Sequence, residues 1–568
     1  MAGPCPPVGE TRAGMSQLDV DESRLLASWP ATVGTDAPPW VRRWRRLTRA
    51  LAGAPGVALA ALAAGLTAFW FASDHDLLLL YADARSHLTI ARRLVDGPNA
   101  GLVQLGTVWL PLPHLALVPF VSFRSLWSSG VAAVPLDLVC LVVQAVSVFS
   151  LVRTCGMPRW VGWVGVTLLL TNPSLLYLHT TGMSEPVLFA AMLLTTATLA
   201  RWAVATKPYS GGELAVFCGL PAAAALLARY DGWAYVAAAT VFVLAVARMR
   251  WGRWRYAIHL ARCFVTLPVI AALWWMWFNW INFGDPLEFQ RGRYSAEAQQ
   301  ELLSRAGLLP EEHDLLRSLG TYTSSVGRVV GWIVVAGGAL GMVVWARRTR
   351  LRPSALAPWL LVIVPFGFYV ASLYTGQIAL RLDEHGGQSM FNLRYGLAMQ
   401  AGLVVFAALG VGSVAGGSES SRLRIAGCAV VAVAFVAVQA VAWWPDWRAV
   451  PVVAEGLAQA DAGASQRRAA DWLHEHAREG TVLIDDSVNP LLPVIDADLN
   501  RVAAPFSGKR WDRALQDPSR ARWVFVDDAN PQDAVRRALR DHPGALDDLE
   551  LRFQDGPALV YESTRDER

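Results

Sequence analysis

The sequence has little charge for its length. Of its 568 residues, 17% are charged and 54% are hydrophobic, whereas soluble domains contain about 25% charged residues. So few charged side chains cannot cover the surface of a soluble globular protein of this size. The composition therefore excludes an ordinary cytosolic enzyme, a disordered protein and a nucleic-acid-binding protein, and it indicates a polytopic membrane protein.

Lysine and paired cysteines are also scarce. Lys207 and Lys509 are the only lysines, so the other 48 of the 50 basic residues are arginine. The six cysteines have no paired spacing, which argues against a disulfide framework and against a metal knuckle. The 25 tryptophans, many of them near the ends of apolar runs, are typical of the aromatic belts of membrane proteins.

A helix that crosses a bilayer needs about 20 apolar residues. This rule predicts eleven spans, at roughly 52–72, 131–152, 158–179, 184–205, 213–229, 231–248, 257–281, 326–346, 355–375, 393–415 and 424–444. Segment 110–123 is shorter and contains three prolines. We expect it to be an interfacial or re-entrant helix, or else a twelfth span.

The arginines indicate how the spans are oriented. A cluster between Arg42 and Arg49 precedes the first span, so residues 1–45 are predicted to be a flexible cytoplasmic tail. If segment 110–123 does not cross the membrane, every arginine cluster between spans falls on the cytoplasmic side. The transmembrane domain is then 46–445, with a large first external loop at 73–130, and residues 446–568 lie outside the plasma membrane.

Residues 446–568 are more charged and read as a globular domain. Two apolar runs, 481–486 and 523–528, each end in an acidic pair, and helical patterns flank them. Strands that alternate with helices predict a small extracytoplasmic α/β domain with a parallel sheet. Neither strand is followed by a glycine-rich phosphate loop, so we interpret the acidic pairs as turn and cap residues.

The first external loop contains a candidate catalytic acid. Asp83 and His87 are four residues apart, so a helix would place them on one face. Asp83 either caps this helix or acts as a general base near apolar surface, and the two roles are compatible. Asp83 and His87 also fit two ligands of a divalent metal, although a surface pair explains them more simply. His114 lines a pocket or begins an interfacial helix.

Further polar residues occur at the predicted external ends of spans: Glu185, Tyr230, Asp231, Arg291, Arg394 and Tyr395. Glu185 either stabilises the start of its helix or faces the same cavity as Asp83. Asp231 forms a local ion pair with Arg229 or contacts a substrate. Arg394 offers a forked donor for a lipid phosphate, or else it is an interfacial anchor.

These residues resemble a known family. The segments YADARSHLTIARRLVDG and VWLPLPHLAL resemble GT-C membrane glycosyltransferases. More narrowly, they resemble the family that includes protein O-mannosyltransferases and the aminoarabinose transferase of lipid A. The resemblance is supported by SEPVLFAAMLL, ARYDGW and FGDPLEF, and it covers about 50–445 as architecture. The family commonly has paired acids in the first loop, whereas Ala84 and Arg85 follow Asp83 here. This departure weakens the case for a metal-dependent reaction. A divalent metal is still a candidate cofactor.

The resemblance implies an inverting glycosyltransferase that moves a sugar from a polyprenyl-phosphate donor to an acceptor hydroxyl on the external side. It implies that Asp83 is the general base, that Arg394, helped by Arg291 or Arg293, holds the leaving phosphate, and that Glu185 orients the acceptor or a metal. The other candidates are expected to line the substrate site: His87, His114, Tyr230, Asp231 and Tyr395.

Other functions fit parts of the sequence. A transporter would show related halves with ionisable groups at the midplane, whereas the polar residues here gather at external span ends and no internal repeat is evident. A noncatalytic cell-envelope scaffold would explain the C-terminal domain, but not the gathering of acids and arginine on one side. A transferase for another lipid-linked group is a third alternative.

Overall fold

The computed structural model describes residues 52–292, 295–305, 307–349, 353–383, 390–415, 433, 437 and 446–565, and its main body is helical. Within these residues, eight helices are long and apolar enough to cross a membrane. They are Ala54–Asp74 (α3), Val131–Thr154 (η2 and α7), Glu185–Val204 (α10), Gly211–Ala228 (α11, η3 and α12), Asp231–Trp251 (α13), Trp254–Phe283 (α14), Ala357–Tyr374 (η4 and α20) and Leu393–Ala415 (η5 and α21). Each coincides with a predicted span, which confirms the polytopic helical fold.

Two predicted spans are interrupted. The run 158–179 forms two short helices, Arg159–Leu170 (α8) and Pro173–Leu178 (α9), because the Asn172 side chain accepts a hydrogen bond from the Leu175 amide, 3.0 Å away, and begins a new helix. The run 326–346 falls on Leu315–Val330 (α17) and Trp332–Thr349 (α18), which are bent by 109°. The break lies at Gly331, whose φ of 91° favours glycine.

Segment 110–123 forms one helix of 11 residues, Pro111–Val121 (α5). At about 1.5 Å per residue, this helix is too short to cross a bilayer, so the expectation of an interfacial or re-entrant helix is the one that fits. The predicted tail 1–45, the predicted span 424–444 apart from residues 433 and 437, and Arg293 lie outside the described residues.

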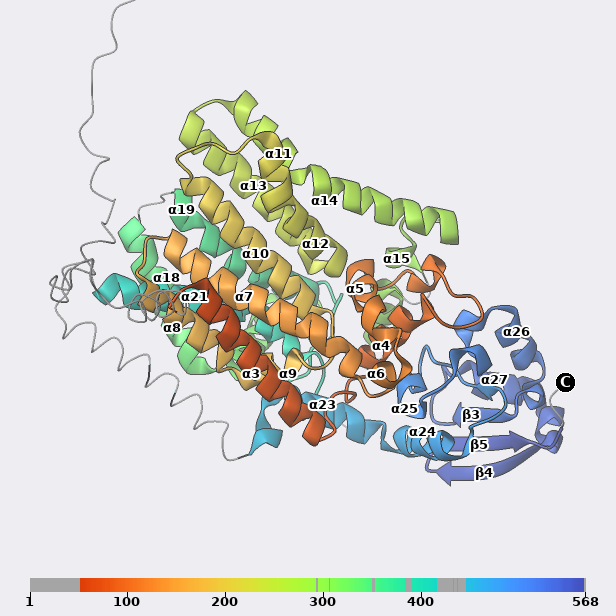
Figure 1. Cartoon of the computed structure of the whole chain (residues 1–568). Coiled ribbons are helices and arrows are strands. Elements are labelled where there is room, and N and C mark those ends of the chain that lie inside the picture. Colours follow the sequence, from red (N-terminus) through yellow and green to blue (C-terminus); the bar gives the residue numbers. More distant parts are fainter. Residues whose placement is uncertain are drawn as a thin grey trace, which may run out of the picture.

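Short helices connect the spans. Those of the first loop are Ala82–Arg93 (α4), Leu102–Leu105 (η1) and Arg124–Ser128 (α6), and those of the later loops are Glu288–Arg291 (α15), Ala296–Arg305 (α16) and Pro353–Leu356 (α19). Helices α4, α5 and α6 lie together at one end of the bundle, next to the C-terminal domain (Figure 1). The first loop therefore lies between the spans and that domain.

The C-terminal domain contains a five-stranded sheet in the order β2-β1-β3-β5-β4. Its strands are Val482–Leu483 (β1), Val502–Ala503 (β2), Trp523–Asp527 (β3), Leu549–Asp555 (β4) and Ala558–Ser563 (β5), and its helices are Trp447–Ala449 (η6), Pro451–Ala462 (α23), Ala464–His476 (α24), Leu492–Ile495 (α25), Leu499–Arg501 (η7), Pro505–Ser507 (η8), Lys509–Gln516 (α26), Pro518–Arg520 (η9), Ala534–Asp541 (α27) and Pro543–Asp548 (η10). The predicted parallel pairing of β1 with β3 is confirmed. The sheet is mixed rather than wholly parallel, because the hairpin β4–β5 pairs antiparallel with β3.

The acidic pairs behave largely as turn residues. Asp485 accepts hydrogen bonds from the amides of Ser487 and Ala534, at 3.2 and 2.9 Å, and Asp527 accepts one from the Ala529 amide at 3.2 Å. Asp486 differs, because it is buried against the first loop and burial raises its pKa to about 7.

The C-terminal domain packs directly on the first loop. Apolar side chains of both parts, among them Leu88, Trp127 and Leu492, form one buried cluster. Polar contacts cross the same boundary: the Arg85 Nε donates to the Pro490 carbonyl at 2.8 Å, and the Tyr81 hydroxyl donates to the Val452 carbonyl at 2.6 Å. The C-terminal domain therefore covers one side of the first loop.

The turn between α12 and α13 depends on a glycine. A Cβ added at Gly232 would lie 2.1 Å from the Ala225 carbonyl oxygen, so Gly232→Ala must push the two helices apart. We expect this variant to lose about 1–3 kcal/mol of stability, measured by thermal unfolding in detergent.

Gly367→Ala is the matched control for this experiment. Gly367 lies in α20, and a Cβ there would have no neighbour within 4 Å. The control should leave stability unchanged or raise it slightly, since alanine favours a helix over glycine. If the two variants unfold at the same temperature, the close approach at Gly232 is not a constraint on the fold.

Candidate active site

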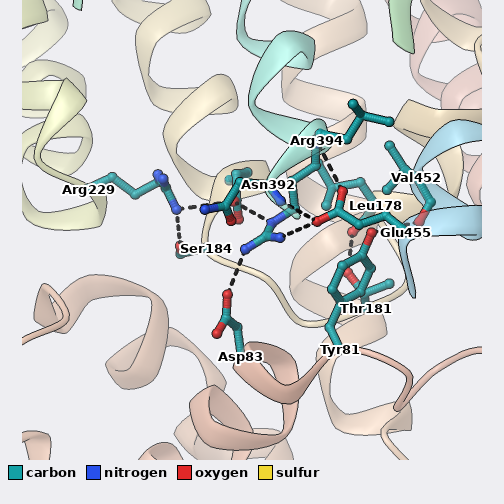
Figure 2. A network of polar contacts seen from close by, with 12 residues as sticks. Tyr81, Asp83, Leu178, Thr181, Ser184, Arg229, Asn392, Arg394, Val452 and Glu455 are labelled. Atoms are coloured by element: carbon teal, nitrogen blue, oxygen red, sulfur yellow. Dashed lines mark hydrogen bonds and ion pairs between the residues drawn. The ribbon is translucent and has the colours of Figure 1, made fainter. Parts of the chain in front are cut away.

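A buried arginine joins three segments that lie far apart in the sequence. Arg394 is at the start of η5, and its side chain is 1% exposed. Its Nη2 donates to Asp83 Oδ2 at 2.6 Å and its Nη1 to Glu455 Oε1 at 2.8 Å (Figure 2). Its Nε donates to Glu185 Oε1 at 3.1 Å. The structure thus brings together Asp83, Glu185 and Arg394, all three of which are sequence candidates.

Asp83 is the accessible member of this group. Its side chain is 41% exposed, whereas those of Glu185 and Glu455 are 0% exposed. The residue at the N-cap of α4 is Tyr81, and no side chain caps this helix by a hydrogen bond. Asp83 lies in the first turn, where its charge favours the helix dipole. Asp83 is therefore not the hydrogen-bonding cap of this helix, and its role as a general base stays a prediction.

Glu455 is a site residue that the sequence analysis missed. It lies on α23, and besides the Arg394 guanidinium it accepts hydrogen bonds from two backbone amides, those of Asn392 at 2.8 Å and Arg394 at 3.1 Å. Asn392 has a φ of 58°, an unusual value for a residue with a side chain. The sole signal in the sequence was an acid within the apolar run that begins at Val450.

A second arginine extends the network. Arg229 Nη1 lies 3.1 Å from Glu185 Oε1, and it also donates to the Ser184 hydroxyl at 3.0 Å. Its Nε lies 3.4 Å from Asp231 Oδ1, and Asp231 Oδ2 accepts a hydrogen bond from the Tyr369 hydroxyl at 2.8 Å. The local ion pair expected between Arg229 and Asp231 is therefore present, and it is continuous with the Arg394 group.

Tyr395 lies between the two arginines. Its ring centroid is 5.1 Å from the Arg229 Cζ and 5.3 Å from the Arg394 Cζ. Cations at this distance are attracted to the face of an aromatic ring, so Tyr395 helps to hold both guanidinium groups.

His87 and His114 form a hydrogen-bonded pair, with 2.8 Å between His87 Nδ1 and His114 Nε2. Both rings are buried, and burial lowers the pKa of His87 to about 4 and the pKa of His114 well below its ordinary value. At neutral pH one uncharged ring therefore donates to the other. Trp109 packs against the pair, with its ring tilted by 45° and its centroid 4.5 Å from that of His87.

Two sequence candidates lie apart from the Arg394 network. The Tyr230 hydroxyl donates to the Val108 carbonyl at 2.9 Å, and its ring stacks on Phe289. Tyr230 thus joins the α12–α13 turn to the first loop. Arg291 is 64% exposed, and its Nη1 lies 3.9 Å from an oxygen of Asp285.

A divalent metal does not fit this arrangement. The part of the chain that the structure describes contains no group of three or more histidine, cysteine, aspartate or glutamate side chains placed to bind a metal ion. The three carboxylates that converge here surround the guanidinium of Arg394, which fills the place where a cation would lie. His87 is paired with another imidazole.

The sequence matches no protein-family model and no curated protein. Its structure, however, is similar to that of ArnT from Cupriavidus metallidurans bound to undecaprenyl phosphate, with 15% identity and a TM-score of 0.52 over 89% of this chain and 98% of ArnT. The same protein in the apo state gives 16% identity and a TM-score of 0.53 over the same shares of the two chains. The chain has the GT-C fold.

The GT-C fold confirms the resemblance from the sequence motifs. An oligosaccharyltransferase from Archaeoglobus fulgidus, crystallised with a tethered acceptor peptide, is also similar, with 12% identity and a TM-score of 0.44 over 90% of this chain and 74% of that chain. Because the alignment covers 89% of this chain and 98% of ArnT, the similarity extends beyond the membrane helices into the C-terminal domain.

Arg394 is expected to hold this site together. Arg394→Met leaves two fully buried carboxylates, those of Glu185 and Glu455, without the cation that they share. Removing one partner of a buried ion pair costs about 3–5 kcal/mol, so we expect a lower unfolding temperature in detergent.

Arg305→Met serves as the control for Arg394→Met. Arg305 is 72% exposed and pairs with Glu301 on the surface of α16, and such pairs contribute about 0–1 kcal/mol. Equal unfolding temperatures for the two variants would contradict a structural role for Arg394.

Proposed function

We propose that this protein is a glycosyltransferase that moves a sugar from a polyprenyl-phosphate donor to an acceptor hydroxyl. The observation that carries the proposal is one accessible carboxylate, Asp83, held from below by a buried arginine at the end of a GT-C helical bundle. The similar ArnT structure contains undecaprenyl phosphate, which supports a lipid-linked donor here. The protein is also proposed to contact membrane lipids through its spans.

In the proposed reaction, Asp83 takes the proton of the acceptor hydroxyl. The acceptor oxygen then forms a bond to the anomeric carbon of the sugar, and the bond from this carbon to the phosphate oxygen breaks. The polyprenyl phosphate leaves with the bonding electrons, and attack from the opposite face inverts the anomeric centre. Asp83 suits the role of base because Arg394 fixes one of its oxygens, Oδ2, while the side chain stays 41% exposed.

The phosphate end of the donor requires a cationic partner. Arg394 carries five N–H donors, and Nη2, which holds Asp83, has a second N–H beside the accessible carboxylate. We propose this N–H as the phosphate contact, so that one guanidinium orients both the base and the leaving group. Glu185 and Arg229, which contact each other behind Asp83, keep the guanidinium in place.

We further propose that this end of the bundle faces the outside of the plasma membrane, with the N-terminus in the cytoplasm. The arginine clusters between the spans support this orientation. A donor that crosses to the outer leaflet would then present its sugar to Asp83, between the first loop and the C-terminal domain.

The test is transfer by Asp83→Asn. Membranes that contain the full chain are incubated with a panel of radiolabelled undecaprenyl-phosphate pentoses and hexoses, and label in envelope glycan, lipid and protein is counted. Loss of a general base lowers rates by about 10²–10⁴-fold, so we expect this loss with an unchanged unfolding temperature.

Asp74→Asn is the matched control, because Asp74 is an exposed acid at the end of α3 that pairs with His75. It should transfer label at the wild-type rate. Wild-type transfer by a folded Asp83→Asn protein would refute the base assignment. Counterflow of labelled free sugar in proteoliposomes, with no transfer from any donor, would instead favour the transporter.

A further inference from the structure

We infer that Glu455 of the C-terminal domain is a positioning residue of the active site, which balances the charge of Arg394 so that Asp83 can accept a proton. This inference rests on the proposed function, because it concerns the same base. It assigns a role to a domain whose contribution the sequence left open.

Glu455 is buried, and both of its carboxylate oxygens accept hydrogen bonds. Its side chain is 0% exposed, and its two oxygens accept four hydrogen bonds, from the Arg394 guanidinium, from the backbone amides of Asn392 and Arg394, and from the side chain of Gln459. The same carboxylate therefore fixes both the backbone at the start of η5 and the side chain that holds Asp83. Helix α23 is anchored in turn by the hydrogen bond from the Tyr81 hydroxyl to the Val452 carbonyl, two residues before α4 reaches Asp83.

Charge explains why such a contact bears on Asp83. An arginine paired with a single aspartate stabilises the carboxylate and makes it a poor proton acceptor. Here the Arg394 charge is shared with two further carboxylates, Glu185 and Glu455, which are fully buried. In such surroundings charges interact strongly, and both glutamates contact the same guanidinium that holds Asp83.

The other groups around Asp83 do not supply this balance. The charged and titratable groups that act on Asp83 are Arg85 and His87 on α4, Arg394 and Tyr395 on η5, and Glu185 and Glu455 through Arg394. Arg85 adds positive charge, and His87, whose pKa burial lowers to about 4, is neutral at pH 7. Glu185 also pairs with Arg229, whereas the ion pair that Glu455 forms is with Arg394.

The experiment compares Glu455→Gln with Glu455→Asp in the full chain. For each, the transfer rate is measured against pH with the undecaprenyl-phosphate sugar that the wild type uses. Without the negative charge, Arg394 holds Asp83 as a carboxylate more firmly. We expect the acid limb of the Glu455→Gln profile to move to lower pH by about one unit and the plateau rate to fall about threefold to tenfold.

Glu455→Asp keeps the charge and should keep the acid limb of the wild type, even if its shorter side chain lowers the rate. Glu475→Gln makes the same charge change at an exposed position of α24, and its profile should match the wild type. A Glu455→Gln protein that is less active with an unmoved acid limb would overturn the inference and leave Glu455 a purely structural residue.

Two further outcomes are informative. If the Glu455→Gln protein does not accumulate in membranes, the pH profile of Glu455→Asp is the test. An acid limb that moves although this variant keeps the negative charge overturns the inference. If Asp83→Asn transfers normally, the proposed function fails first. An inactive Asp83→Asn together with a wild-type profile for Glu455→Gln refutes the inference alone.

Discussion

The architecture at the end of the bundle depends on one buried positive charge. A guanidinium with 1% exposure is stable only when carboxylates and hydrogen bonds replace its lost hydration. Arg394 obtains these from three segments: the first loop, the start of α10 and the C-terminal domain. Because each partner comes from a different part of the chain, satisfying this charge also fixes how the parts meet.

The same interaction prepares the site for chemistry. Of the three carboxylates, two are completely buried and one is accessible. The buried pair serves to hold the arginine, and the accessible one is held by it at a defined place. A site with such preorganised charge does not need to rearrange when charge develops in a transition state. This is the physical basis on which we favour sugar transfer over a scaffold.

The C-terminal domain is part of this arrangement and not an appendage. It shares an apolar cluster with α4, α5 and α6, and its Glu455 contacts the Arg394 guanidinium. The similarity to the ArnT structure covers 89% of this chain and 98% of ArnT, so it extends beyond the membrane helices into the C-terminal domain.

The sequence alone determined most of the local structure. Long apolar runs can be stable only as membrane helices, so eight spans were predictable, and the alternation around 481–486 and 523–528 predicted the parallel strands β1 and β3. Asp83, Glu185 and Arg394 stood out because charged groups beside spans are costly.

Only the tertiary structure decided which of these residues meet. Hydropathy stays high across Gly331 and Asn172, where the chain bends or restarts, since those breaks depend on one backbone angle and one side-chain cap. Tyr230 and Arg291 were candidates of the same kind as Arg394, yet they lie apart from it. The sequence signalled Glu455 only as an acid within an apolar run, because its role depends on a partner 61 residues away. Polarity and periodicity are local and can be read along a chain, whereas the compensation of a buried charge is set by distances that exist only after folding.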